Sequence, residues 1–408
     1  MTYHFKLNSL GRNNNYFLVI ARKMRKFIFI LFVVSVWNNI TASAEEVRGY
    51  KSQKDIDTLK SFLSKIEPAS YRQINKVLTQ KHVLPRYEIF SKQTRKMAAA
   101  ANRFCAMPTQ DSLSELRKSF HMAADAWSGI QHIKFGPIED KLRLNRIYYW
   151  PDKHNTGSKH LRRLLKSKDK SRLEQERFAL ISVALQGFPA LERLLFSQSK
   201  ALFSGNEDAI FRCHFILSIT KNLQIIAETV LQEWVEENEG FLKVTTSTGA
   251  PFYSGENEIF QDFLASLYGN FRAIHDLKLR RPLGETPEKS RPKRSEAWRS
   301  ERSLKNIILN LEAARQLFQG EGGFGIDDFI TMLHPGTSIT KDFNTYLDYT
   351  LNTARNISLP MYKAVRNPQQ HDQVDRLKAQ VQALLVFVKG RIANSVGLGI
   401  GFNLLDGD

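Results

Sequence analysis

The chain has 408 residues, a formal net charge of +18, and 42% hydrophobic and 25% charged residues. This length suits one large domain or two of ordinary size. The two cysteines have no C-x-x-C spacing, which argues against a metal site built from cysteines alone. The positive charge suits a nucleic acid, an anionic lipid or an acidic partner, or is a general property of the surface.

Residues 1–44 have the features of an export signal. Met24-Arg25-Lys26 precedes the apolar run 27–37, and small residues at 42–44 fit a cleavage site that ends at Ala44. This run is too short for a stable bilayer span, which needs about 20 residues. We therefore expect a periplasmic mature chain with no stable membrane span. Residues 45–408 carry 53 basic and 41 acidic side chains, a net charge of +12, and export argues against a nucleic-acid partner.

The mature chain retains Cys105 and Cys213. In an oxidising compartment these two residues are expected to form a disulfide, which would close a long loop and restrict the unfolded chain. The alternative is a pair of separate buried thiols.

Apolar residues recur at helical spacing through most of the mature chain. The clearest example is residues 113–130, where Leu, Phe, Ala, Trp and Ile follow a 3-4-3-4-3 pattern along one helix face. No segment alternates polar and apolar residues for long enough to indicate a strand. The pattern predicts an all-α protein with helices over 72–103, 113–130, 176–196, 207–234, 258–279, 295–319, 342–360 and 372–395.

These helices divide into two predicted bundles. Residues 45–240 form the first bundle and residues 256–408 the second. The Thr/Gly/Pro-bearing stretch 241–255 is the linker between them. Ala126-Trp127-Ser128 and Ala297-Trp298-Arg299-Ser300 hint that the two bundles arose by internal duplication.

A proline interrupts the predicted helix 176–196. Pro189 removes one backbone donor and crowds the preceding turn, so we expect the helix to kink or restart near Gly187. Glu192 follows Pro189 by three residues and is predicted to lie on the same face, near carbonyls that the break leaves free. Glu192 is therefore a candidate ligand-binding residue. The alternative is a kinked core helix in which Glu192 forms a buried ion pair with an arginine or lysine.

The stretch around Glu192 resembles the signature Gly-x-His-x-x-Glu of the imelysin-like family. Gly187 and Glu192 match this signature, but Pro189 occupies the histidine position. The resemblance implies two facing helical bundles and a link to iron acquisition. Four further stretches resemble the same family in the same order: Phe135-Gly136-Pro137, Tyr149-Trp150-Pro151-Asp152, Arg294–Ser300 and Gly401–Asp408.

Other polar residues lie in stretches that helix packing does not explain. Asp152 follows a Trp-Pro turn and is a candidate ligand-binding acid. Residues 294–300 are predicted to begin a helix, where an arginine fork suits a carboxylate or phosphate ligand, although Glu296 and Arg299 at i, i+3 could instead pair with each other. The apolar tail is expected to fold back onto the bundles, with a solvated tail as the alternative. The candidate ligand-binding residues are Asp152, Glu192, Arg294, Glu296, Arg299, Ser300, Asp406 and Asp408.

Common catalytic motifs are absent from the sequence. No His-Glu-x-x-His motif is present for a zinc peptidase, and no Gly-x-Ser-x-Gly elbow for a serine hydrolase. The favoured hypothesis is a non-catalytic binding or accessory protein linked to iron or other divalent metal acquisition, with its site in a polar cleft between the bundles. An imelysin-type metallopeptidase and an envelope scaffold are the alternatives. Pro189 argues against the peptidase because proline neither ligates a metal nor transfers a proton. An envelope or outer-membrane protein is the candidate partner.

Overall fold

The structure is a computed structural model that describes residue 61 and residues 66–236, 240–246 and 253–398. Every regular element in these residues is a helix, which confirms the all-α prediction. The described residues from 66 to 398 belong to one compact unit. The predicted export signal and Ala44 lie outside the described residues, as do Asp406 and Asp408.

The first long element is almost continuous from residue 68 to residue 106. It consists of α3 (Pro68–Val77), the π-helical turn η1 (Leu78–Val83) and α4 (Leu84–Ala106). Pro85 lies in the first turn of α4, where the missing N–H is absorbed by the wider π-turn instead of breaking the helix. Pro85 therefore lies beside a local widening of one long helix and not at a break.

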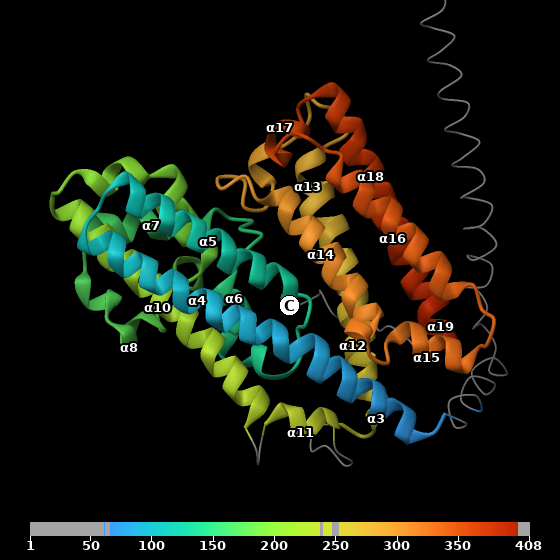
Figure 1. The fold of residues 1–408 in the computed structure, drawn as a ribbon. Helices are drawn as coiled ribbons and strands as arrows, with labels where there is room; N and C mark the ends of the chain where they lie inside the picture. The colour runs from blue at the N-terminus through green and yellow to red at the C-terminus, as the bar shows by residue number, and fades with distance from the viewer. Residues whose placement is uncertain (1–60, 62–65, 237–239, 247–252, 399–408) are drawn as a thin grey trace, which may run out of the picture. The chain divides into compact units, whose positions relative to one another are not determined.

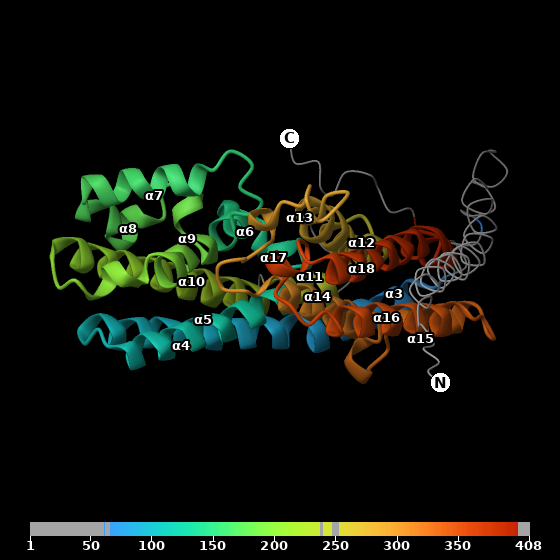
Figure 2. The same ribbon diagram turned by 90° about the horizontal axis from the view of Figure 1, so that it is seen from above.

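Two further long helices pack against α4. They are α5 (Gln110–Ile130) and α10 (Glu207–Val235), and they lie beside α4 in both ribbon views (Figures 1 and 2). Thr109 is the N-cap of α5, and its side chain and that of Ser112 form a reciprocal capping box. The predicted seam of α5 is buried from Leu113 to Ile130.

A disulfide joins Cys105 near the end of α4 to Cys213 in the second turn of α10, as predicted. The two Cα atoms lie 5.5 Å apart, and the bond spans 108 residues of sequence. Closing a loop of this length stabilises the folded chain by about 4–5 kcal/mol in the loop-entropy model.

A second group of long helices follows α11 (Phe241–Thr246). Helix α12 (Glu256–Arg272) continues through the π-turn η8 (Ala273–Leu279) into α13 (Arg280–Leu283), and α14 (Ser303–Phe318) packs on both α12 and α16 (Ile339–Arg355). Helix α18 (Pro368–Phe387) packs against α16 and α12 and ends through η11 (Val388–Ile392) and α19 (Ala393–Ser395).

Short helical segments complete the described chain. Within the first half they are η2 (Gly136–Ile138), η3 (Asp140–Leu142), α6 (Arg143–Ile147), α7 (Thr156–Ser167), η4 (Lys170–Leu173), α8 (Gln175–Phe178), η5 (Val183–Leu185), α9 (Phe188–Glu192), η6 (Arg193–Ser197) and η7 (Ser199–Phe203). Within the second half they are η9 (Pro292–Arg294), η10 (Gly320–Gly322), α15 (Ile326–Leu333) and α17 (Met361–Ala364).

The two groups of helices meet at several places, two of which are contacts between long helices. Helix α3 packs on α12, and α5 packs on α14. Both contacts carry polar bonds: Asn75 Nδ2 donates to the Glu256 carbonyl at 2.8 Å, and Asn310 Nδ2 donates to the Ser128 carbonyl at 2.7 Å. Helix α3 lies within the predicted first bundle, yet it packs on α12 of the predicted second bundle. The division into two bundles around residues 241–255 therefore stays a prediction, as does the internal duplication.

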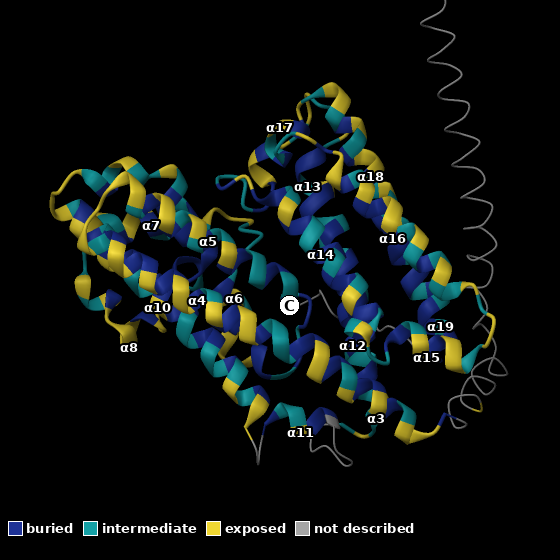
Figure 3. Ribbon diagram, in the orientation of Figure 1, coloured by how far each residue is buried: buried dark blue, intermediate teal, exposed yellow. Residues whose placement is uncertain are grey.

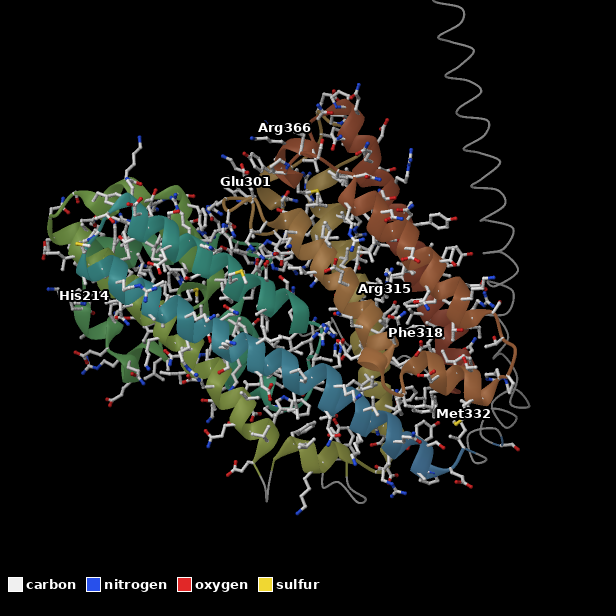
Figure 4. All side chains as sticks on the ribbon, in the orientation of Figure 1. His214, Glu301, Arg315, Phe318, Met332 and Arg366 are labelled. Carbon is white, nitrogen blue, oxygen red and sulfur yellow. A yellow bond between two sulfur atoms is a disulfide. The ribbon has the colours of Figure 1, made fainter. Side chains whose placement is uncertain are left out.

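The core is apolar and rich in aromatic side chains. Buried residues line the facing sides of the long helices, and exposed residues alternate with them on the outer sides (Figure 3). Phe318 and Phe343 pack with ring centroids 4.2 Å apart where α14 meets α16, and Phe318 is labelled in Figure 4. His214 on α10 is exposed (Figure 4). None of the described helices is long and apolar enough to cross a membrane.

Candidate functional site

The candidate site is built around the start of α9. Gly187 is the N-cap of this helix and lies so close to another segment that a Cβ atom there would be 2.0 Å from the Ile147 carbonyl oxygen. Only glycine fits at this distance. Pro189 lies in the first turn of α9, where its N–H would have no intrahelical partner.

The break near Gly187 is thus a true helix start. The predicted restart is correct, but Pro189 does not interrupt a continuous α-helix, because residues 186 and 187 directly before α9 are not helical. The predicted helix 176–196 is instead α8, a 3-10 turn, α9 and the π-turn η6.

Glu192 ends α9 and is 5% exposed. Its Oε1 accepts a hydrogen bond from the Ser300 backbone N–H at 2.9 Å and another from the Ser300 hydroxyl at 2.7 Å. The hydrogen-bond partner is Ser300, 108 residues away. The alternative of a buried ion pair with an arginine or lysine is not found for Glu192 within the described residues. Burial raises the pKa of the Glu192 carboxyl, and the Ser300 bonds, Arg299 and Arg193 partly oppose that rise.

Asp152 holds two elements in place. Its two carboxylate oxygens accept hydrogen bonds from the backbone N–H groups of Thr156 at 2.7 Å and Gly157 at 2.9 Å, at the start of α7. Arg193 Nη2 lies 3.5 Å from Asp152 Oδ2, and Arg193 Nη1 donates to the Pro189 carbonyl at 3.0 Å. The guanidinium rests against Gly157, where a Cβ would approach it within 3.0 Å. Asp152 therefore ties α7 to α9.

Residues 295–302 form an irregular loop that leads into α14. The helix begins at Ser303, so the prediction that residues 294–300 begin a helix is wrong. Ala297 and Glu301 have φ values of 44° and 59°, which are unusual for residues with a Cβ atom. The loop presents Ser300 to Glu192 and stacks the Arg299 guanidinium on the Trp298 ring, 4.4 Å from its centroid. At the exposed end of this loop, Glu301 accepts a hydrogen bond from the Tyr362 hydroxyl (Figure 4).

Glu296 occupies a buried polar network behind this loop. It is 1% exposed, and its Oε2 lies 2.9 Å from Lys278 Nζ and accepts a hydrogen bond from Asn306 Nδ2 at 3.0 Å. Lys278 Nζ also donates to Asn310 Oδ1 at 2.7 Å. The alternative pairing of Glu296 with Arg299 is not found, because Glu296 pairs with Lys278. Burial raises the pKa of the Tyr148 hydroxyl, and the charges of Glu296 and Glu192 raise it further.

Arg302 links the loop to α5. Its guanidinium forms an ion pair with Asp125 and donates to Asn306 Oδ1 at 3.1 Å, and it lies 3.1 Å from His121 Nδ1. Burial, and then the Arg302 charge, lower the pKa of His121 to about 4. The imidazole is therefore neutral near pH 7.

These segments enclose a pocket of about 280 Å³. Its walls come from α5, the Tyr148–Asn155 stretch, the start of α9, and residues 293–302. Seven lining residues are cationic and two are acidic. The cationic residues are Lys153, Arg193, Arg281, Lys293, Arg294, Arg299 and Arg302; the acidic residues are Asp152 and Glu192.

The imelysin family model (peptidase M75) matches residues 83–386, which is more than half of the chain. The chain belongs to the imelysin family. Of the signature positions, Pro189 and Glu192 line the pocket, and Gly187 is the N-cap of the helix that carries them. The predicted resemblance is confirmed.

Two solved structures share the fold. An imelysin-like protein from Psychrobacter arcticum 273-4 has a TM-score of 0.66 at 17% identity, with 83% of this chain and 99% of that chain covered. A protein from Parabacteroides distasonis ATCC 8503, described as an iron-regulated protein A precursor, has a TM-score of 0.67 at 13% identity, with 79% and 95% covered. No curated protein matches this imelysin.

A bare iron or other divalent metal ion does not fit the pocket. Its two carboxylates are already engaged, Glu192 by Ser300 and Asp152 by two backbone N–H groups and Arg193. No histidine or cysteine is among the lining residues, and no group of three or more potential ligands occurs elsewhere within the described residues. The surrounding arginines would also repel a cation.

The structure brings most of the predicted site residues together. Asp152, Glu192, Arg294 and Arg299 line the pocket, Ser300 binds Glu192, and Glu296 lies behind the wall in a separate network. Sequence reasoning missed Arg193, Arg281, Lys293 and Arg302. Arg193 and Lys293 are next to Glu192 and Arg294 in the sequence, and Arg302 follows Ser300 by two residues, so proximity to these residues was an available signal. Arg281 had no such signal.

Proposed function

We propose that this imelysin is an exported, non-catalytic ligand-binding protein that serves iron or other metal acquisition in the periplasm. The observation that carries the proposal is the pocket itself: residues from two distant parts of the chain, around Glu192 and around Arg299, enclose a small cationic cavity. The description of the Parabacteroides distasonis protein as iron-regulated supports the link to iron. An envelope or outer-membrane protein is the proposed partner that receives the ligand.

Two features argue against metallopeptidase activity. Pro189 stands at the histidine position of the signature and offers neither a metal ligand nor a proton. Glu192 is held by Ser300, and Arg193 and Arg299 are the nearby charges that act on it. A general base in a zinc site needs a metal-bound water to activate, and cationic neighbours disfavour the metal that would supply one.

Native mass spectrometry tests the proposal on protein purified from the envelope fraction without chelator. We expect a bound small molecule or complex in the wild type that is lost from Arg299→Glu, a reversal of charge on the pocket wall. N-terminal sequencing of the same sample should give Glu45 as the first residue.

Peptidase assays on an unfolded protein substrate, with and without added divalent metal, provide the opposing outcome. Metal-dependent cleavage that Glu192→Gln abolishes would overturn the non-catalytic proposal. A preparation with no bound species in either variant, and no pocket-dependent ligand in a screen, would overturn the binding role.

A further inference from the structure

The cationic side chains of the pocket are not balanced by acids. Arg193 pairs with Asp152, and Arg302 pairs with Asp125. The other five cationic residues form no ion pair within the part of the chain that the structure describes, although the charge of Glu192 acts on Arg299. They are Lys153, Arg281, Lys293, Arg294 and Arg299. The pocket therefore has a surplus of positive charge that the protein itself does not neutralise.

Two pairs of arginines are crowded together in the pocket wall. Burial, and then the neighbouring Arg294, lower the pKa of Arg281. Burial and the neighbouring Arg193 lower the pKa of Arg299, although Glu192 opposes this. Arginine stays protonated in proteins. The lowered pKa values therefore mean that burial and the neighbouring arginines make the charged guanidinium groups of Arg281 and Arg299 less stable. An anion placed between them would relieve this repulsion.

Several hydrogen-bond donors around the pocket have no partner. Ser295 is 1% exposed and Arg302 is 5% exposed, yet the Ser295 hydroxyl and Arg302 Nε make no hydrogen bond. Arg193 Nε is also buried without a partner. All three residues line the pocket. Buried polar groups without partners are rare and costly, so these donors indicate that the pocket takes a ligand rich in acceptors.

The size of the pocket limits the ligand to a compact molecule. A volume of about 280 Å³ lies at the lower end of the range of about 300–1,000 Å³ that is usual for small-molecule sites. Guanidinium groups bind carboxylates and phosphates through two parallel hydrogen bonds. Arg281 and Arg294 also line a second, more open pocket that includes Arg280 and Arg291, so the positive surface continues beyond the first.

We propose that the pocket binds a compact anion with two or more carboxylate or phosphate groups, in place of a bare metal ion. This inference rests on the proposed function, since it names the ligand class of the same site. Arg294 and Arg299 bind the oxyanion groups, and Ser295, Arg193 and Arg302 supply further donors after small side-chain movements. Metal reaches such a site as part of a negatively charged complex with the anion.

Isothermal titration calorimetry on the mature protein at low ionic strength tests the ligand class. The probes are citrate, ferric citrate, inorganic pyrophosphate, Zn²⁺ alone and uncharged glucose. We expect binding of at least one anion and none of Zn²⁺ or glucose, with an affinity that falls as salt is added. Comparing the affinities for citrate and pyrophosphate shows whether the pocket prefers carboxylate or phosphate groups. Comparing citrate with ferric citrate shows whether it prefers the free anion or its metal complex.

Matched arginine variants locate the binding. Arg299→Gln and Arg294→Gln should each weaken anion binding by about tenfold or more, which corresponds to the loss of one charge-assisted contact. Arg280→Gln is the control, because Arg280 lines only the second pocket and pairs with Asp276. Circular dichroism checks that each variant is folded, and the exposed Arg294 remains usable if Arg299→Gln is unstable.

The outcomes separate this inference from the proposed function. If the protein binds Zn²⁺ or glucose and Arg299→Gln weakens that binding, the pocket is a binding site but its ligand is not an anion. If anions bind equally well to the wild type, Arg299→Gln and Arg294→Gln, the anion site does not lie in this pocket. The absence of any ligand, from solution or in the purified protein, would overturn the inference together with the proposed function.

Discussion

Two buried glutamates in this imelysin differ in what neutralises them. Glu296 is paired with Lys278 and bonded to Asn306 behind the pocket wall. Glu192 faces the pocket and has only Ser300 as its hydrogen-bond donor, with no ion pair in the described residues. A charge that is fully paired inside the protein stabilises one arrangement of helices, whereas a charge left partly unmatched at a cavity is free to influence a ligand. The comparison assigns Glu296 to structure and Glu192 to the site.

The largest expected effect comes from breaking the Glu296 pair. Glu296→Gln leaves Lys278 buried without a counter-charge and should reduce the free energy of unfolding by about 3–5 kcal/mol. Chemical denaturation monitored by circular dichroism measures the loss. Glu285→Gln is the control, because the Glu285–Lys289 pair is exposed and should contribute about 0–1 kcal/mol. A loss below about 1 kcal/mol for Glu296→Gln would show that the pair is not a structural requirement.

The next effect concerns the hydroxyl that holds Glu192. Ser300→Ala removes one of two donors to a buried carboxylate and should lower the free energy of unfolding by about 1.5–3 kcal/mol. The same change in a Glu192→Gln background should cost less, since the bond to a neutral amide is weaker. Equal losses in the two backgrounds would contradict a charge-assisted bond.

The matched change at the pocket should have a small effect on stability. Glu192→Gln keeps the shape and an oxygen that accepts from Ser300, and it removes a buried charge that has no ion-pair partner. We expect the free energy of unfolding to change by about 1 kcal/mol or less. Calorimetric binding and thermal melts, run together, test this expectation. If Glu192→Gln lowers the free energy of unfolding as much as Glu296→Gln does, Glu192 also has a structural role and the two glutamates do not differ.

The smallest effects are opposite pH dependences from two groups beside the pocket. The pKa of Glu192 is raised in the folded state, so its contribution to stability is present below the ordinary value of 4.5 and is lost as the pH rises through the folded pKa. The pKa of His121 is lowered from 6.5 to about 4, so its contribution is present above 6.5 and is lost as the pH falls towards 4.

Denaturation curves across pH 4 to 8 measure these two dependences. Glu192→Gln should make stability rise more steeply with pH above 4.5, and His121→Gln should flatten the loss of stability between 6.5 and 4. His214→Gln is the control, since His214 is exposed on α10 (Figure 4). Curves for both test variants that run parallel to the wild type would show that neither group is perturbed as the structure indicates.

Much of this imelysin was predictable from the sequence because its signals are local. Helical periodicity identified the long helices and the buried seam of α5, and the compartment implied by the leader favoured the Cys105–Cys213 bond. The motif around Gly187 and Glu192 identified the family. These features follow from the spacing of residues along one segment, from residue type, or from the compartment that the predicted export signal implies.

The tertiary structure alone decided the partners of the charged residues. Nothing in the sequence links Glu192 to Ser300 or Glu296 to Lys278, because these pairs depend on how an irregular loop and distant helices pack. The sequence left open whether the helix kinks or restarts near Gly187. The structure shows a restart, with Gly187 against the Ile147 carbonyl and Pro189 in the first turn of a new helix. Side chains far apart in sequence share a pocket only when the fold brings their segments together. The surplus of arginines at that pocket is therefore a property of the structure and not of any motif.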